Sequence, residues 1–202
     1  MADEYATLQQ LQNLRNSEAT SVSPANDSDL QRRLTVSSRA IDNKTGREPG
    51  GFLADGSTSA RIFRTTGRRV PGPDGEALLV DEISTDTGLT VEVSNDGTNW
   101  TAVTDYTPEP LNALVKGRPL TKLRRNRSWW TSLFVRVTAD WGWPAVPDEV
   151  VEATLLLANR LVLRKDSPEG VAGSPEWGVL RLSRWDPDVE TLIGPYVLPG
   201  FA

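Results

Sequence analysis

The sequence predicts an α+β protein in which a small α-helical bundle is interrupted by an inserted antiparallel β domain. Three observations predict this class: apolar residues recur at helical spacing near both ends of the chain, short strand-like runs fill the middle, and stretches rich in Gly, Ser or Pro lie at the changes of pattern. The 202 residues, 38% of them hydrophobic, suffice for one sizeable core or two small ones. The expected parts are N-terminal helices in 1–60, the inserted β domain in 61–145, and a long helix, short strand, short helix and extended tail in 146–202.

Two helices are predicted before residue 60. The first runs from about Asp3 to Arg15, and the second from about Ser28 to Asn43, with a cap at Asn26 or Asp27 and a stop at Gly46. The apolar stripe of the first helix is Tyr5, Leu8, Leu11 and Leu14, and the apolar face of the second is Leu30, Leu34 and Ile41.

The middle of the chain is predicted to form strands that are separated by turns. The turn from Ser94 to Gly97 contains residues that tolerate positive φ, so 91–93 and 100–103 are expected to form a hairpin. Apolar residues alternate with other side chains from Leu133 to Ala139, which indicates one buried face. The predicted strands are 61–66, 77–84, 89–93, 99–104, 120–124 and 133–139.

The longest predicted helix spans Asp148 to Leu163, which contains neither Gly nor Pro and begins with acidic residues. Its apolar arc is wider than one small core requires, so part of it is expected to face a neighbouring subunit. The candidate subunit-interface residues are Val151, Leu155, Leu156 and Val162.

The C-terminal region is predicted to hold a short strand in 179–184 and a short helix from Pro187 to Ile193, capped by Asp186. The residues after Pro195 are apolar, but Pro199 and Gly200 prevent a helix. They are therefore expected to form an exposed tail that docks on a partner; the alternative is that the tail folds back on its own helical domain. The large groups of the tail are Tyr196, Val197, Leu198, Pro199 and Phe201.

Composition argues against the common catalytic chemistries. The chain contains no Cys and no His, which removes thiolate and imidazole nucleophiles, bases and metal ligands. No acidic pair is placed to face one substrate, so no catalytic residue, cofactor or metal site is expected. The net charge of −5 argues against general affinity for nucleic acid, and no apolar run is long enough for a membrane span or signal peptide, so a soluble cytoplasmic protein is expected.

Two clusters have both a functional and a structural interpretation. Lys122, Arg124, Arg125 and Arg127, followed by Trp129 and Trp130, could form a platform for single-stranded nucleic acid, but surface arginines at a hairpin tip explain them better. Asn95, Asp96 and Asn99 could bind calcium, but the spacing lacks further acidic ligands and a hairpin turn is favoured.

Several stretches, in order along almost the whole chain, match the motifs of one known family. The first is Ser37-Ser38-Arg39-Ala40-Ile41-Asp42 with Thr45-Gly46-Arg47, and the second is Trp141-Gly142-Trp143-Pro144-Ala145-Val146-Pro147. The third comprises Ala153-Thr154-Leu155-Leu156-Leu157-Ala158, Arg160-Leu161 and 164–173, and the ending is Asp186-Pro187-Asp188-Val189 and Pro195-Tyr196. Together these stretches resemble the head-to-tail connector (adaptor) family of long-tailed bacteriophages.

This resemblance implies a structural, non-enzymatic virion protein with a connector-type helical bundle, assembled in the host cytoplasm. It implies a homo-oligomeric ring, expected to have 12 subunits, between the portal protein and the stopper, head-completion or tail-terminator protein. Double-stranded DNA would pass through the lumen without sequence-specific binding, and the tail residues 196–199 and Phe201 would contact the portal. The large β segment departs from the minimal family pattern. Two alternatives stay open: a stopper or tail-terminator ring subunit, and a carbohydrate- or surface-binding module that uses Trp100, Trp129 and Trp130.

Overall fold

The computed structural model describes residues 4–17, 26–166, 171–172, 180–181 and 186–199. Its contacts divide the chain into two compact units, one formed by residues 1–51 with 146–202 and the other by residues 52–145. They are called here the helical unit and the sheet unit. The first boundary therefore lies near residue 52 and not near residue 60, because Phe52 and the following turns belong with the strands.

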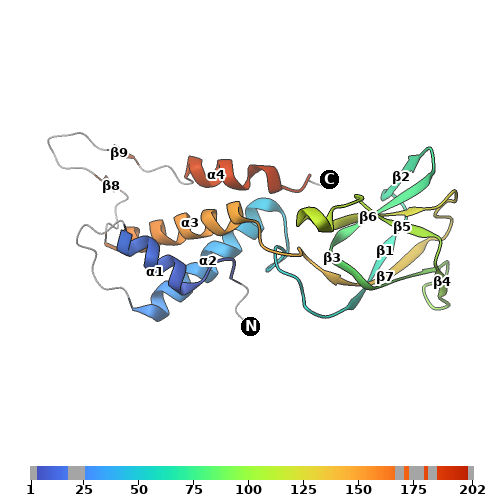
Figure 1. Ribbon diagram of the computed structural model, residues 1–202, viewed down its shortest axis with the longest axis horizontal. Coiled ribbons are helices and arrows are strands. Elements are labelled where there is room, and N and C mark those ends of the chain that lie inside the picture. Colours follow the sequence, from blue (N-terminus) through green and yellow to red (C-terminus); the bar gives the residue numbers. More distant parts are fainter. Residues whose placement is uncertain (1–3, 18–25, 167–170, 173–179, 182–185, 200–202) are drawn as a thin grey trace. The chain divides into compact units, whose positions relative to one another are not determined.

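Four α-helices make up most of the described part of the helical unit: α1 (Leu8–Ser17), α2 (Asp27–Thr45), α3 (Asp148–Asp166) and α4 (Pro187–Ile193). Helices α1 and α2 both pack on α3, and α4 packs on α3 as well (Figure 1). A short antiparallel pair, β8 (Val171–Ala172) and β9 (Leu180–Arg181), lies between α3 and α4 in the sequence.

The apolar stripes predicted from the sequence meet in the helical core. Leu30 and Leu34 of α2 are buried against Leu11 of α1 and against Leu155 and Val162 of α3. Complete burial of each such side chain contributes about 1.5–3 kcal/mol. The ends of α2 and the start of α4 follow the prediction, because the side chains of Asn26 and Asp186 cap α2 and α4, and Gly46 ends α2 with φ of 77°. Helix α1 differs from the prediction, since it begins at Leu8 and not near Asp3, and Tyr5 precedes it.

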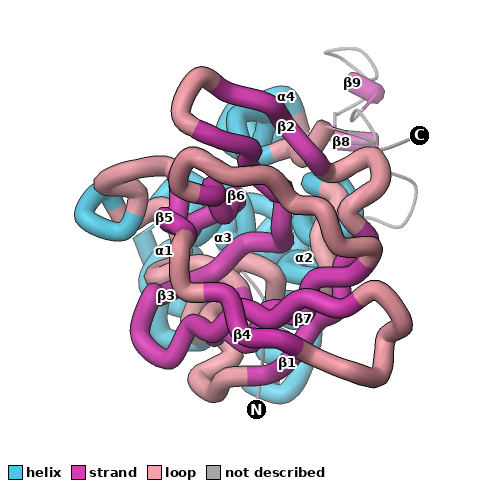
Figure 2. Tube along the Cα trace, turned by 90° about the vertical axis from the view of Figure 1, so that its right-hand side faces the viewer, coloured by secondary structure: helices cyan, strands magenta, loops and turns pink. Residues whose placement is uncertain are grey.

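The sheet unit contains seven antiparallel strands that curve around one core (Figure 2). The strands are β1 (Ser59–Arg64), β2 (Arg69–Gly72), β3 (Gly75–Ser94), β4 (Thr101–Val103), β5 (Tyr106–Glu109), β6 (Leu120–Arg125) and β7 (Phe134–Trp141). The sheet order is β1-β7-β3-β6-β5, and β2 and β4 also pair with β3. Strand β3 therefore connects both halves of the sheet, since its first half pairs with β2 and β6 and its second half with β4 and β7.

Six predicted strands correspond to five observed ones. The runs 77–84 and 89–93 join into the 20-residue β3, which continues through Gly88 at φ of 75°. The hairpin at 94–97 is confirmed, with Val91 opposite Val103. Strands β2 and β5 were not predicted, because each is four residues long and contains a proline.

The predicted alternation of buried residues with less buried ones is confirmed within β7, but Leu133 is not part of the strand. Val135, Val137, Ala139 and Trp141 are buried, and Phe134 begins the strand. Leu133 precedes the strand and is 56% exposed.

Candidate functional site: the C-terminal end of helix α2

The first motif of the resemblance coincides with the C-terminal half of α2. Its residues hold three separate parts of the helical unit: the N-terminal residues 4–6, the segment 46–51 that leaves α2, and the C-terminal segment 194–199. The last of these is called here the strap. The helix end itself is fixed by Thr45, whose hydroxyl donates to the carbonyl of Ile41 at 2.9 Å.

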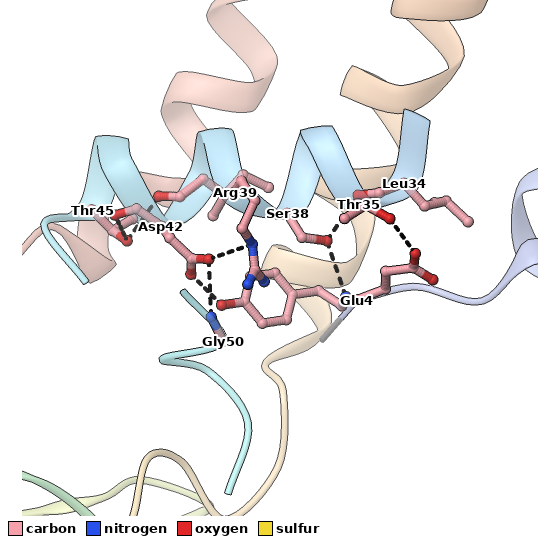
Figure 3. Close-up of polar contacts among 10 residues, drawn as sticks. Glu4, Leu34, Thr35, Ser38, Arg39, Asp42, Thr45 and Gly50 are labelled. Atoms are coloured by element: carbon pink, nitrogen blue, oxygen red, sulfur yellow. Dashed lines mark hydrogen bonds and ion pairs between the residues drawn. The ribbon is translucent and has the colours of Figure 1, made fainter. Parts of the chain in front are cut away.

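Asp42 is the centre of this arrangement, with a side chain that is only 1% exposed. Its carboxylate accepts a hydrogen bond from the backbone N–H of Gly50 at 3.1 Å, forms an ion pair with Arg39 at 3.1 Å, and accepts a hydrogen bond from the hydroxyl of Tyr5 (Figure 3). Burial raises the pKa of Asp42 above its ordinary value, and the bonds from Tyr5 and Gly50 oppose that rise. Buried carboxylates are stable only where such donors surround them, so Asp42 fixes both segments to α2.

The N-terminal residues attach to the same face of α2 one turn earlier. The hydroxyl of Ser38 accepts from the backbone N–H of Tyr5 at 3.2 Å and donates to the carbonyl of Leu34 at 3.0 Å. Glu4 accepts from Thr35. Figure 3 shows these contacts on the same side of the helix as the contacts of Asp42.

The strap is bound to the last turn of α2 and to the residues that follow it. The backbone N–H of Leu198 donates to the carbonyl of Thr45 at 2.9 Å, and the guanidinium of Arg47 donates to the carbonyl of Tyr196. The hydroxyl of Tyr196 donates to Glu149 of α3 at 2.8 Å. These bonds close a link between α2, α3 and the strap.

The strap corrects one expectation about the tail. Residues Gly194–Tyr196 form a 3-10 turn and the chain is hydrogen-bonded to α2 as far as Leu198, so this part folds back on its own unit. The side chains of Val197 and Leu198 nevertheless remain 47% and 38% exposed, and Pro199 is exposed. Phe201 lies outside the described residues.

The predicted subunit-interface residues of α3 separate into two groups. Leu155 and Val162 are 7% and 3% exposed and belong to the core with α1 and α2, and Val151 packs against that core. The subunit's own helices therefore cover Leu155 and Val162, which leaves these two residues little surface for a neighbouring subunit. Leu156 is only partly buried, and the exposed Leu163 lies two turns further along.

Two arginines of the basic cluster of the sheet unit form ion pairs within that unit. Arg124 pairs with Glu109 at 2.6 Å, and Arg125 pairs with Asp105 at 2.8 Å. Trp130 is 1% exposed and its indole N–H donates to the carbonyl of Leu123, whereas Trp129 is 55% exposed. The two tryptophans therefore do not form a joint stacking surface.

The remaining candidates behave as turn residues. The carboxylate of Asp96 accepts the backbone N–H groups of Asn99 and Thr98 at 2.8 and 2.9 Å, and these bonds hold the pKa of Asp96 well below its ordinary value. Over the described ranges, no three acidic side chains gather as a metal site would require. The same ranges contain no helix with the length and apolarity of a membrane span.

Sequence reasoning missed the pairing of Tyr5 with Asp42. A usable signal existed, because Ser38 and Asp42 lie four residues apart on a helix face that otherwise buries Leu34 and Ile41. Polar residues on a buried face require partners, and this requirement points to a segment that packs there.

Comparisons with known proteins find matches among solved structures but none by sequence. No protein-family model matches the chain, and no curated protein matches it by sequence. A chain from the neck of an empty gene transfer agent (GTA) particle, computed with C6 symmetry, aligns with a TM-score of 0.53 at 15% identity over 98% of this chain and 92% of its own length. A chain from the neck of the native GTA particle, computed with C12 symmetry, aligns with a TM-score of 0.48 at 16% identity over 96% and 90%. Both of these chains come from the neck of a phage-like particle, and this protein shares the α+β fold of the first.

Proposed function

We propose that this protein is a structural subunit of the neck of a tailed phage or phage-like particle, and that it forms the head-to-tail connector ring beneath the portal. The observation that carries the proposal is the fold match to the neck of the empty GTA particle, which extends over 98% of this chain and so includes both units. The motif resemblance to phage connectors supports the same assignment. Two residues of the first motif join separate segments in this structure, since Asp42 binds Gly50 and Arg47 binds Tyr196.

A ring is supported by the C6 symmetry of that neck, since closed symmetry requires a contact that repeats between identical subunits. The expected number of subunits is 12, by resemblance to the connector family. DNA would pass through the lumen without being held, and the charge distribution agrees: the helical unit has 11 basic and 16 acidic residues, a net charge of −5, while the sheet unit has 11 of each.

The portal is the proposed partner of the strap. Val197, Leu198 and Pro199 expose apolar surface on a segment whose backbone is already fixed to α2, so little conformational entropy is lost when a partner covers it. Stopper or tail-terminator proteins would bind the other end of the ring. The purified subunit is expected to be monomeric or weakly associated and to close into a ring on the portal.

Binding to purified heads and tails tests the connector assignment. The full chain should sediment with DNA-filled heads that carry a portal but lack the neck, and it should not sediment with isolated tails. The V197D/L198D variant should lose head binding, while the matched variant V36D, at a 49% exposed position on α2, should retain it. Binding to tails in the absence of heads would instead identify a stopper or tail-terminator subunit.

A further inference from the structure

A short segment between β5 and β6 of the sheet unit exposes two large apolar side chains. It consists of residues 111–118 and is called here the knob. Val115 is 88% exposed and Leu111 is 67% exposed, the two highest values among the large hydrophobic residues that are exposed in the described ranges. Isolated exposed apolar residues are ordinary, but two on one short turn form a contact surface.

The knob is held in a fixed shape. It contains the 3-10 turn Leu114–Lys116, in which the N–H groups of Lys116 and Arg118 donate to the carbonyl of Ala113 at 2.9 and 3.0 Å. Ala113 is 5% exposed and Leu114 packs against the core of the sheet unit. Ala113 and Leu114 therefore hold the turn on the core of the sheet unit. A partner that covers Leu111 and Val115 would lose little conformational entropy, because the segment is already ordered.

The knob is also basic. Lys116 and Arg118 are exposed, and within the part of the chain that the structure describes no carboxylate pairs with either of them. The arginines of the neighbouring strand differ, since Arg124 and Arg125 are both paired. The knob thus combines two apolar side chains with two available positive charges.

A surface of complementary character lies on the helical unit. Glu152, Leu156 and Leu163 fall within about 40° on the helical wheel of α3, because helical residues advance by about 100° each. Glu152 is exposed, Leu156 is partly buried and Leu163 is 48% exposed. This α3 stripe combines apolar side chains with a carboxylate, on a unit whose net charge is −5.

We propose that the knob of one copy docks on the α3 stripe of a second copy. Val115 and Leu111 would cover Leu156 and Leu163, and Lys116 or Arg118 would pair with Glu152. The two surfaces are different patches of one chain, so the contact is heterologous, and repeating it closes a ring where the rotation between neighbouring copies divides a full turn evenly. The inference rests on the proposed ring function and specifies the contact that builds it.

The absence of cysteine allows a direct test by disulfide trapping, because a disulfide forms only where Cα atoms come within about 7 Å. One full-length chain carries V115C and another carries L156C or L163C, and the two are mixed with portal-bearing heads and oxidised. A cross-linked dimer of the two chains is expected. The matched control Q9C, at an exposed position on α1, should give at least five-fold less dimer with V115C.

Charge reversal gives a second readout. K116E/R118E should reduce the cross-linked dimer several-fold, E152K in the partner chain should restore part of it, and R64E, at an exposed position on β1, should leave it unchanged. Rings that assemble without a cross-link from V115C to L156C or L163C would overturn the inference and leave the neck function standing. Failure of the chain to assemble on heads at all would overturn the proposed function together with the inference.

Discussion

Replacing Asp42 with alanine is expected to destabilise the helical unit strongly. The substitution removes the acceptor for Tyr5 and Gly50 and the ion-pair partner of Arg39, all at a site where the Asp42 side chain is 1% exposed. The hydroxyl of Tyr5 and the N–H of Gly50 are left without an acceptor, and each such unpaired group costs about 1–3 kcal/mol. For a chain of this length, that corresponds to a fall in melting temperature on the order of 10 °C.

Circular dichroism at 222 nm during thermal unfolding measures this effect on the helices. The matched control is D81A, because Asp81 also pairs with arginine, at 2.9 Å from Arg61, but its side chain is 40% exposed. Exposed ion pairs are worth about 0–1 kcal/mol, so D81A should change the melting temperature by a few degrees at most. If D42A loses no more stability than D81A, Asp42 does not hold the N-terminal residues and the 46–51 segment on α2.

The variant D42N adds a test of the sign of the pH dependence. Because burial raises the pKa of Asp42 in the folded state above its ordinary value of 3.8, the folded state binds this proton more tightly than the unfolded state. Stability from this group is therefore present below pH 3.8 and lost as the pH rises through the folded-state pKa. The stability of the wild type relative to D42N should fall across that interval and then level off; a relative gain with rising pH would contradict the assignment.

Three further changes test other parts of the structure. Y5F should cost about 1.5–3 kcal/mol because it removes a hydrogen bond to a buried carboxylate, while Y106F, whose hydroxyl donates to the carbonyl of Leu89, should cost about 0.5–1.5 kcal/mol; denaturant titration compares them. Deleting 196–202 should lower the melting temperature of the helices by several degrees, since the backbone bond from Leu198 and the bond from Tyr196 to Glu149 are lost; an unchanged melting temperature would contradict this attachment. Replacing 52–145 with a short flexible linker should leave a helical unit that unfolds cooperatively by calorimetry, and a gradual transition would show that the two units share their stability.

Local rules were sufficient to predict most of the elements. The cap at Asn26, the stop at Gly46 and the Asp186-Pro187 start are signals contained within a few residues, and all three are confirmed. The hairpin at 94–97 follows from its turn residues in the same way. Strands β2 and β5 could not be predicted because each is stabilised by pairing with a long strand and not by its own pattern.

The candidate site depends on contacts between distant residues, so local sequence patterns indicate less of its structure. Nothing local to Tyr5 indicates that its hydroxyl meets Asp42, 37 residues away. The wide apolar arc of α3 was interpreted as an interface, but Leu155 and Val162 face α1 and α2, since helices on two sides cover more of α3 than a single stripe would. The C-terminal tail is attached to α2 through the backbone N–H of Leu198, and a backbone hydrogen bond of this kind cannot be predicted from residue types.

Imaging of the assembled particle tests the neck assignment most directly. A small tag on the N-terminus of this chain can be labelled in purified particles and located by electron microscopy with averaging around the neck axis. We predict a ring of label directly beneath the portal, with the sheet and helical units of each copy fitted into the density between head and tail. Label on the tail shaft or tail tip, or particles with a complete neck that lack this chain, would contradict the assignment.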